Sequence, residues 1–358
     1  APTGRASKRM SEATGEDAKT IHRLLNLTGG EVPDQITVLD CDVVICDEIS
    51  MVDIFIFNAL LKAIPLGSRL ILVGDKDQLP SVACGNILAD IINSKLFPTV
   101  ELKSIYRQAE ESMIIVNAHR INNGIMPKIS AESDFFIDNK GTAEEVLDSV
   151  ISMVTERIPK YLSISPKDIQ VLAPVKKGIA GVENLNKKLQ QALNPNGEQT
   201  KHLETVFRVS DKVMQTANNY AMEWERIGMF REKGTGVFNG DIGYVIDIKD
   251  GITVEFEDGK ICRYKGADLD EIMLAYCISV HKSQGCEFPV AIIAISGSNH
   301  AIMTRNLLYT AVTRAKTMSV IVGSMDSVAY MVGNNYTAKR YSLLLPLLLQ
   351  NHEKYIGK

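Results

Sequence analysis

The feature that most restricts the fold is an apolar run that ends in two acids. Residues 43–46 are Val-Val-Ile-Cys, and Asp47 and Glu48 follow directly. A short apolar run rich in β-branched residues predicts a strand buried on both faces of a parallel sheet. Ligands of open α/β sheets bind beyond the carboxyl ends of the strands, so acids at this point are placed for a metal ion and an activated water. Taken alone, such a pair is equally typical of a solvated turn.

A second run of the same kind covers residues 69–73 and is followed by Gly74, Asp75 and Gln78. Because the carboxyl ends of neighbouring parallel strands meet at one edge of a sheet, we expect the acids of both runs to lie there. Gln78 carries a hydrogen-bond donor and an acceptor, so its side chain can respond to the presence of a γ-phosphate. Together the two strand ends favour nucleotide chemistry over a pair of ordinary turns.

The phosphate-binding loop GxxxxGK[ST], which nucleotide motors carry before such a strand, is absent from the 358 residues. The nearest candidate, residues 15–20, has Ala18 in place of the required glycine and is too short. The pair Gly259-Lys260 is followed by Ile261, which cannot bind Mg²⁺. We therefore expect the sequence to begin just downstream of such a loop.

Length and composition set further limits. A chain of 358 residues predicts two or three domains. The net charge of −4 excludes a uniformly basic surface, so any nucleic-acid site must be a local groove. The six cysteines form no CxxC pair, which is typical of reduced thiols. There is no signal peptide and no apolar run of the roughly 20 residues that a membrane span needs, so we expect a cytoplasmic protein without membrane contact.

The chain alternates between strand and helix patterns except in residues 208–270. There the apolar runs become short and alternating, with Asp-Gly turns at residues 250–251 and 258–259. This pattern predicts a small antiparallel β-barrel inserted into an α/β body. We therefore expect the α/β class, with domains at residues 1–100, 101–207 continued by 271–358, and the barrel between them.

Basic residues follow several of the later strands and helices. Lys176 and Lys177 follow the strand expected at residues 169–173 and suit DNA phosphates, as does the polar block 281–284. Arg107 follows a predicted strand, and Arg314 lies near the end of a helix. An arginine at the junction of two sheet domains can stabilise the charge of a γ-phosphate, although an ordinary ion pair is the more common role for each residue alone.

Six blocks occur in the order found in superfamily-one helicases, and the chain resembles most closely the RecD-like group, the exodeoxyribonuclease V alpha-subunit family of 5′→3′ DNA helicases. The resemblance covers essentially the whole chain. Each block is weak evidence alone, whereas six in order on their expected elements are strong evidence. The blocks are residues 1–6, 47–50, 74–80, 106–108, 280–285 and 309–316.

This resemblance implies two RecA-like parallel-sheet motor domains, the first truncated at its N-terminus, with an inserted SH3-like barrel. It implies an ATP-dependent DNA helicase that uses ATP and Mg²⁺ and moves 5′→3′ on single-stranded DNA and at junctions of single and double strands. A monomer and possible association with the subunits of a nuclease complex are also implied. Without the phosphate loop, we expect the chain alone to bind nucleotide poorly.

The family's functional residues transfer to matching positions. Asp47 resembles the acid associated with Mg²⁺ and Glu48 the base that polarises the attacking water. The residues that resemble the other nucleotide-contacting groups are Asp75, Gln78, Arg107, Gln284, Gly285 and Arg314. Those that suit or resemble DNA contacts are Pro2, Thr3, Arg5, Lys176, Lys177, His281, Lys282 and Ser283.

Two other interpretations stay open. In the first, the chain is a single-stranded DNA-binding or partner-docking module with an inactive motor, and it binds DNA without hydrolysing ATP. In the second, Asp47, Glu48, Asp75 and Asp77 form a metal-dependent nuclease site that cuts DNA without ATP. Gln78 and the two arginines have no evident role in a nuclease.

Overall fold

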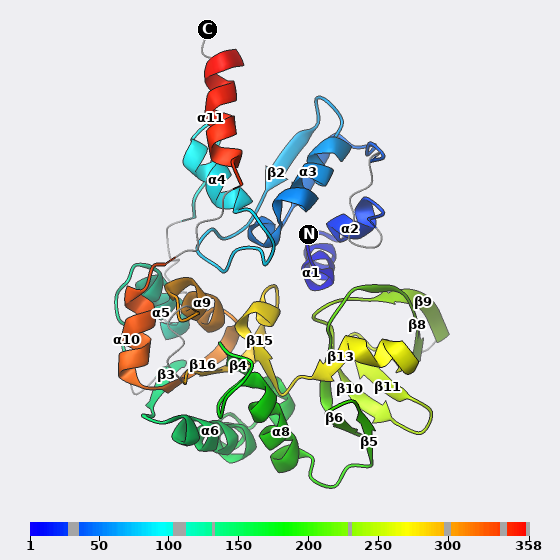
Figure 1. Ribbon diagram of the computed structural model, residues 1–358, viewed down its shortest axis with the longest axis vertical. Helices are drawn as coiled ribbons and strands as arrows, with labels where there is room; N and C mark the ends of the chain where they lie inside the picture. The colour runs from blue at the N-terminus through cyan, green and yellow to red at the C-terminus, as the bar shows by residue number, and fades with distance from the viewer. Residues whose placement is uncertain are drawn as a thin grey trace. The chain divides into compact units, whose positions relative to one another are not determined.

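The computed structural model describes residues 1–27, 36–102, 112–130, 133–227, 231–296, 302–336 and 342–355. The chain forms two compact units, shown in Figure 1. The first unit combines Ala1–Tyr106 with the C-terminal segment Tyr336–Lys358, and the second is Arg107–Asn335. The expected domain boundaries place residues 336–358 in the second domain instead.

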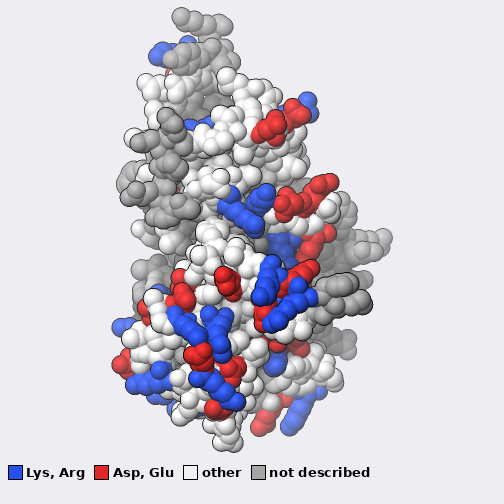
Figure 2. Space-filling view, turned by 90° about the vertical axis from the view of Figure 1, so that its right-hand side faces the viewer, with Lys and Arg blue, Asp and Glu red and all other residues white. Residues whose placement is uncertain are grey.

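Charged side chains of both signs are interspersed on the face shown in Figure 2. This distribution agrees with the small net charge of −4 and gives that face no uniformly basic area. In the described part of the chain, no helix combines the length and the apolar character that crossing a membrane requires.

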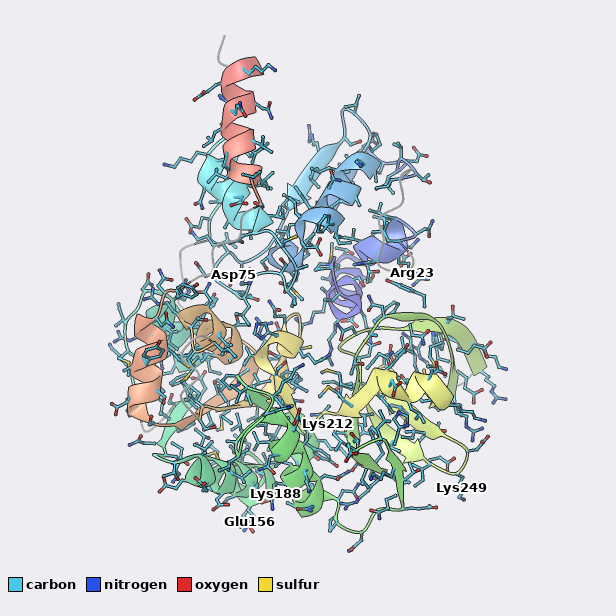
Figure 3. The ribbon with its side chains drawn as sticks, in the orientation of Figure 1. Arg23, Asp75, Glu156, Lys188, Lys212 and Lys249 are labelled. Atoms are coloured by element: carbon cyan, nitrogen blue, oxygen red, sulfur yellow. The ribbon has the colours of Figure 1, made fainter. Side chains whose placement is uncertain are left out.

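The first unit is built on a parallel pair of strands in which Val43 lies opposite Arg69 and Cys46 opposite Leu72. Asp75, labelled in Figure 3, follows the second strand. Helix α11 packs on α4, which explains why the C-terminal segment belongs to this unit. The elements are α1 (Gly4–Thr14), α2 (Ile21–Leu24), β1 (Val43–Cys46), η1 (Ile49–Met51), α3 (Ile54–Ala63), β2 (Arg69–Leu72), α4 (Ile87–Ser94) and α11 (Leu344–Tyr355).

The prediction that β1 and β2 are buried on both faces is wrong. Val44 and Cys46 lie in a core with the buried face of α3, but Val43 and Ile45 are 46% and 52% exposed, and Ile71 is 46% exposed. Successive side chains of a strand point to opposite faces, so one layer of helices covers only alternate residues. The described residues of this unit cover one face of the sheet and leave the other apolar and exposed.

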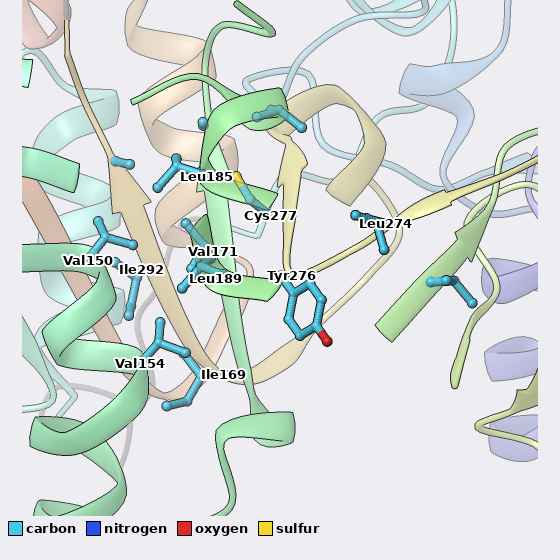
Figure 4. Packing of buried hydrophobic residues seen from close by; sticks show 14 of the residues in the cluster. Val150, Val154, Ile169, Val171, Leu185, Leu189, Leu274, Tyr276, Cys277 and Ile292 are labelled. Atoms are coloured by element: carbon cyan, nitrogen blue, oxygen red, sulfur yellow. The ribbon is translucent and has the colours of Figure 1, made fainter. Parts of the chain in front are cut away.

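The second unit contains a five-stranded, wholly parallel sheet in the order β14-β4-β15-β16-β3. Helices α6 and α8 lie on one face, and α5, α9 and α10 lie on the other (Figure 1). All five residues of β4 are buried, the pattern of a strand covered on both sides. Side chains of β4 and β15 pack against those of α6 and α8 in the core shown in Figure 4. The elements are α5 (Met113–Asn122), β3 (Phe135–Asn139), α6 (Ala143–Ser152), η2 (Met153–Arg157), α7 (Ile158–Leu162), η3 (Pro166–Asp168), β4 (Ile169–Ala173), α8 (Val182–Leu193), β14 (Cys277–Ser279), η5 (Val280–Ser283), β15 (Phe288–Ala294), α9 (Arg305–Val312), β16 (Ala315–Gly323) and α10 (Met325–Gly333).

An antiparallel domain is inserted between α8 and β14, as predicted. Its seven-stranded sheet has the order β13-β7-β10-β11-β12-β8-β9, beside a separate β5-β6 hairpin. The two Asp-Gly turns connect β10 to β11 and β11 to β12. At Gly251, with φ of +96°, a Cβ atom would lie 2.3 Å from the carbonyl oxygen of Tyr264, so only glycine fits. The strands are β5 (Gln199–His202), β6 (Thr205–Arg208), β7 (Lys212–Gln215), β8 (Asn219–Ile227), β9 (Arg231–Val237), β10 (Ile242–Asp247), β11 (Ile252–Phe256), β12 (Ile261–Tyr264) and β13 (Ile272–Leu274), with η4 (Gly266–Glu271) before β13.

A buried carboxylate joins this domain to the α/β body. Asp211, at the start of β7, accepts hydrogen bonds from Asn194 Nδ2 (2.8 Å), Gln190 Nε2 (2.5 Å) and the Tyr276 hydroxyl (2.9 Å). It also accepts one from the Arg208 N–H (2.7 Å). Burial raises the pKa of Tyr276, and Asp211 raises it further, so the hydroxyl stays a proton donor. These bonds fix the inserted domain on α8 and on the strand that returns to the body.

The environments of the cysteines predict an order of reaction with iodoacetamide. Cys84 is exposed, whereas burial raises the pKa of Cys262 to about 12 and also raises that of Cys277. Only about one in 10⁴ of the Cys262 thiols is then a thiolate at pH 8. We expect mass spectrometry to find Cys84 alkylated first, and Cys262 and Cys277 alkylated only after unfolding in guanidinium. Early alkylation of Cys262 in the folded protein would contradict the burial described here.

Candidate functional site

The carboxyl ends of β1 and β2 meet at one edge of the first unit. Beyond the paired strands, the Val73 N–H donates to the Cys46 carbonyl (2.8 Å) and the Ile49 N–H donates to the Val73 carbonyl (3.0 Å). These bonds continue the parallel register past the strand ends. The structure therefore brings the pair Asp47-Glu48 and the segment after Val73 to the same edge, the arrangement that the sequence predicts.

Glu48 has a backbone conformation that is unusual for a residue with a side chain. Its φ of 54° and ψ of 38° lie in the left-handed region, which costs about 1–2 kcal/mol for an L-residue. The Asp47 carboxylate accepts a hydrogen bond from the Glu48 N–H (2.8 Å) and stabilises this turn. Strained backbone of this kind clusters at functional sites, where it aims a side chain. Glu48, half-buried at the strand end, fits that description.

Asp75 and Gln78 form a hydrogen-bonded pair. One Asp75 carboxylate oxygen accepts from the Gln78 side-chain amide (3.2 Å), and the other accepts from the Asp77 N–H (2.9 Å). The carboxylate thus shapes the turn after β2 and orients the amide of Gln78. A change at either residue is therefore transmitted to the other.

The donor set at this edge suits magnesium held jointly with phosphate. No group of three or more His, Cys, Asp or Glu side chains placed to hold a metal ion occurs among the described residues. Mg²⁺ in nucleotide sites is commonly bound by one or two carboxylates together with water and substrate phosphates. The half-buried carboxylate of Asp47 fits such a role. The described residues do not form a site in which the protein alone would supply all the metal ligands.

The N-terminal block lies near the same edge. Thr3 caps α1, because its hydroxyl oxygen accepts a hydrogen bond from the Ala6 N–H (3.2 Å). Burial lowers the pKa of the Ala1 amino group, while nearby Cys46 and Asp47 act to raise it. The Ala1 amino group therefore lies near the end of β1, and Pro2, Thr3 and Arg5 follow it in the chain. All three of these predicted DNA contacts are half-buried.

In the second unit, the predicted DNA-binding blocks follow neighbouring strands. Strands β4 and β14 pair in parallel, and Lys176 and Lys282 lie just beyond their carboxyl ends. Burial lowers the pKa of Lys282, and Lys176 lowers it further, so the two ammonium groups are close enough to repel each other. Two like charges held together in this way are typical of a site that binds an anion.

The other members of these blocks differ in their exposure. Lys177 and His281 are exposed. Ser283 is buried, and its hydroxyl donates to the Val280 carbonyl (2.8 Å). Within block 281–283, His281 and Lys282 are thus the side chains that reach the surface, and Ser283 shapes the turn that carries them.

Arg314 lies against the segment that contains Gln284 and Gly285. Its guanidinium donates to the carbonyls of Cys286 (3.2 Å) and Thr310 (3.0 Å) and to the Thr313 hydroxyl (3.0 Å). The second unit therefore brings together three of the residues predicted to contact nucleotide. The fourth member predicted for this unit, Arg107, lies outside the described residues.

One contact was not anticipated from the sequence. Lys282 Nζ donates to Asn239 Oδ1 (3.3 Å), and Asn239 belongs to the turn between β9 and β10 of the inserted domain. The dipeptide Asn239-Gly240 is typical of a β-turn, and the turn alone is enough to explain why these two residues occur here. The contact spans 43 residues of sequence, so local pattern does not reveal it.

The described residues thus combine a strand-end acidic edge, a second parallel sheet with basic loops and an inserted antiparallel domain. Family models agree along the chain. Residues 1–136 match an AAA domain, residues 185–256 match the SH3 domain of ATP-dependent RecD-like DNA helicases, and residues 274–322 match the UvrD-like helicase C-terminal domain.

The relatives point to the same group. The chain is 32% identical over 346 residues to the ATP-dependent RecD2 DNA helicase of Deinococcus radiodurans. The alignment covers 96% of the chain and 45% of that protein. It is 29% identical over 364 residues to the RecD subunit of the RecBCD enzyme of Mycolicibacterium smegmatis. That alignment covers 92% of the chain and 62% of the relative. The chain is thus similar to RecD-like helicases along almost its whole length, and it spans about half the length of the curated relatives it matches.

Solved structures confirm the fold. A structure of Pif1 helicases at forked double-stranded DNA has a TM-score of 0.51 at 20% identity and covers 99% of this chain and 86% of its own. Bacteroides Pif1 bound to single-stranded DNA has a TM-score of 0.51 at 18% identity, with coverage of 99% and 92%. The predicted α/β class with RecA-like parallel sheets and an SH3-like insertion is confirmed.

Proposed function

We propose that this chain supplies motor domains of an ATP-dependent DNA helicase that moves 5′→3′ along single-stranded DNA. The observation that carries the proposal is the meeting of Asp47-Glu48 with Asp75-Gln78 at one sheet edge. The similarity to RecD-like helicases supports it. The activity in this proposal belongs to a loop-bearing form, by which we mean the chain with a GxxxxGK[ST] loop upstream of Ala1.

The predicted nucleotide-site residues have different roles in the proposed hydrolysis of ATP. Asp47 would hold Mg²⁺, which neutralises phosphate charge when bound with ATP. The Glu48 carboxylate orients the attacking water and accepts its proton, while Gln78, held by Asp75, responds to the γ-phosphate. Arg314 stabilises negative charge on the phosphate. Arg107 is proposed for the same task.

The DNA partners follow from the same comparison. Pro2, Thr3, Arg5 and the lysines beyond β4 and β14 would contact the backbone of a single strand or of a junction with duplex. One relative is a subunit of the RecBCD enzyme, so association with nuclease subunits is part of the proposal. A monomeric motor is proposed as the working form.

ATP hydrolysis measured with and without single-stranded DNA tests the proposal. We expect the loop-bearing form to hydrolyse ATP faster when DNA is added, and the chain alone to turn over little ATP. A loop-bearing form that holds DNA but hydrolyses nothing would favour the DNA-binding module. Metal-dependent cutting of DNA without ATP would favour the nuclease.

The two strand-end lysines give a second test. Lys176→Ala and Lys282→Ala should each weaken binding of an oligo-dT strand and lower the salt dependence of log K by about 0.7, the value for one phosphate contact on a single strand. Lys188→Ala is the matched control, because this exposed lysine lies on α8 (Figure 3). Fluorescence anisotropy across a salt series gives both quantities. An unchanged slope in either variant would remove that lysine from the proposed interface.

A further inference from the structure

The turn between β9 and β10 holds the backbone of Asn239 in one position. The Phe238 N–H donates to the Asp241 carboxylate (2.9 Å), and the Asp241 N–H donates back to the Phe238 carbonyl (3.0 Å). The Asn239 N–H donates to the Asn218 side chain (3.0 Å), and the Gly240 N–H donates to a β7 carbonyl (2.9 Å). Every backbone N–H from Phe238 to Asp241 is therefore bonded, while the Asn239 side chain is exposed.

The exposed side chain of Asn239 meets the ammonium group of Lys282. The backbone of Lys282 is itself fixed, because its N–H donates to the Ser279 hydroxyl oxygen (3.3 Å) at the start of η5. The Lys282 side chain then spans from the body to Asn239 Oδ1, at 3.3 Å from Nζ. A lysine has four rotatable side-chain bonds and loses considerable rotamer freedom when its ammonium is held in one place.

The chemistry of Asn239 suits a holder of this lysine beside a phosphate. An ammonium group has three N–H donors, and the amide oxygen of Asn239 accepts one of them without adding charge. A carboxylate at this position would neutralise Lys282 and repel a phosphate. An alanine would leave the ammonium to be pushed away by Lys176, which lies close enough to lower the pKa of Lys282.

We propose that Asn239 is a positioning residue that holds the Lys282 ammonium for contact with a DNA phosphate, so that the SH3-like domain and the body share one phosphate-binding edge. This inference rests on the proposed function and deepens it. Asn239 acts through Lys282 and need not touch DNA itself. The ligand is the phosphodiester backbone of a single strand, recognised by charge and not by sequence.

A double-mutant cycle on the 358-residue chain tests the inference, with oligo-dT affinity measured by fluorescence anisotropy. We expect Lys282→Ala to weaken binding by about tenfold and Asn239→Ala by about threefold, since one removes the charge and the other only its holder. In the Lys282→Ala background, Asn239→Ala should have no further effect. An equal weakening in both backgrounds, or none in either, would overturn the positioning role.

Two controls separate this role from a structural one. Asn196→Ala removes another exposed Asn that precedes a glycine in the same unit, and it should leave DNA affinity and thermal unfolding unchanged. Asn239→Asp keeps an acceptor for Lys282 but adds a negative charge, so it should weaken DNA binding at low salt more than at high salt. A salt-independent loss in Asn239→Asp would indicate a change in folding and count against the role.

A measurement without DNA separates the failure of this inference from that of the proposed function. In NMR spectra of ¹³C-methylated lysines, Asn239→Ala should shift the Lys282 signal and leave that of Lys188 unchanged. If the shift is seen and the cycle is additive, the contact exists but the positioning role falls, and the proposed function stands. If the unaltered chain binds no single-stranded DNA, this inference is refuted, whereas the proposed function is decided by DNA-stimulated ATP hydrolysis in the loop-bearing form.

Discussion

Glu48→Gln in the loop-bearing form is expected to lower the DNA-stimulated rate of ATP hydrolysis by at least about 100-fold, the effect of losing a general base. Glutamine has nearly the same size and can adopt the left-handed backbone of Glu48 at a similar cost, but its amide cannot accept a proton from water. The Asp47 carboxylate and its bond to the residue 48 N–H remain. Nucleotide and DNA affinity should therefore be nearly unchanged, so the loss appears in kcat.

The controls for this prediction distinguish base catalysis from general damage. Glu16→Gln changes an exposed glutamate in the same unit and should leave kcat unchanged. Binding of a fluorescent ATP analogue shows whether Glu48→Gln still holds nucleotide. Hydrolysis at the parent rate in Glu48→Gln would move water activation to another residue and remove the main catalytic assignment.

The ends of β1 and β2 were predictable because two rules act locally there. Short β-branched runs form strands, and ligand-binding residues follow the carboxyl ends of parallel strands. These rules placed Asp47, Glu48, Asp75 and Gln78 at one edge. The exposed face of β1 was not predictable in the same way, because the burial of Val43 and Ile45 depends on which layers cover the sheet.

The contacts that join the inserted domain to the body were missed for a different reason. The bond from Lys282 to Asn239 links residues 43 apart, and the bond from Tyr276 to Asp211 links residues 65 apart. Sequence periodicity reports only which face of an element is buried, and it gives no information about which polar groups meet across the fold. The roles of Asp211 and Asn239 became visible only through their partners, whereas the role of Arg107 stays a prediction.

Asp211→Ala should strongly destabilise the second unit. The wild-type carboxylate is 0% exposed and accepts bonds from Gln190, Asn194, Arg208 and Tyr276. Removing it takes one acceptor from each of these donors. Gln190 and Asn194 still donate to the Val206 and Val209 carbonyls, and each group left unsatisfied costs about 1–3 kcal/mol. Since the side chains relax in part, we expect the free energy of unfolding of the second unit to fall by about 3–5 kcal/mol.

The lone tryptophan provides the measurement, because Trp224 lies on β8 of the inserted domain and its fluorescence follows that domain in a denaturant titration. Asp250→Ala is the matched control: its carboxylate pairs with Lys265 and Arg263 at the surface, where such pairs contribute little. Tyr276→Phe removes one donor of the four and should cost about 1 kcal/mol. If Asp211→Ala unfolds at the same denaturant concentration as the parent, the buried network does not hold the SH3-like domain on the body. The fixed position of Asn239 beside Lys282 must then come from the β-turn alone.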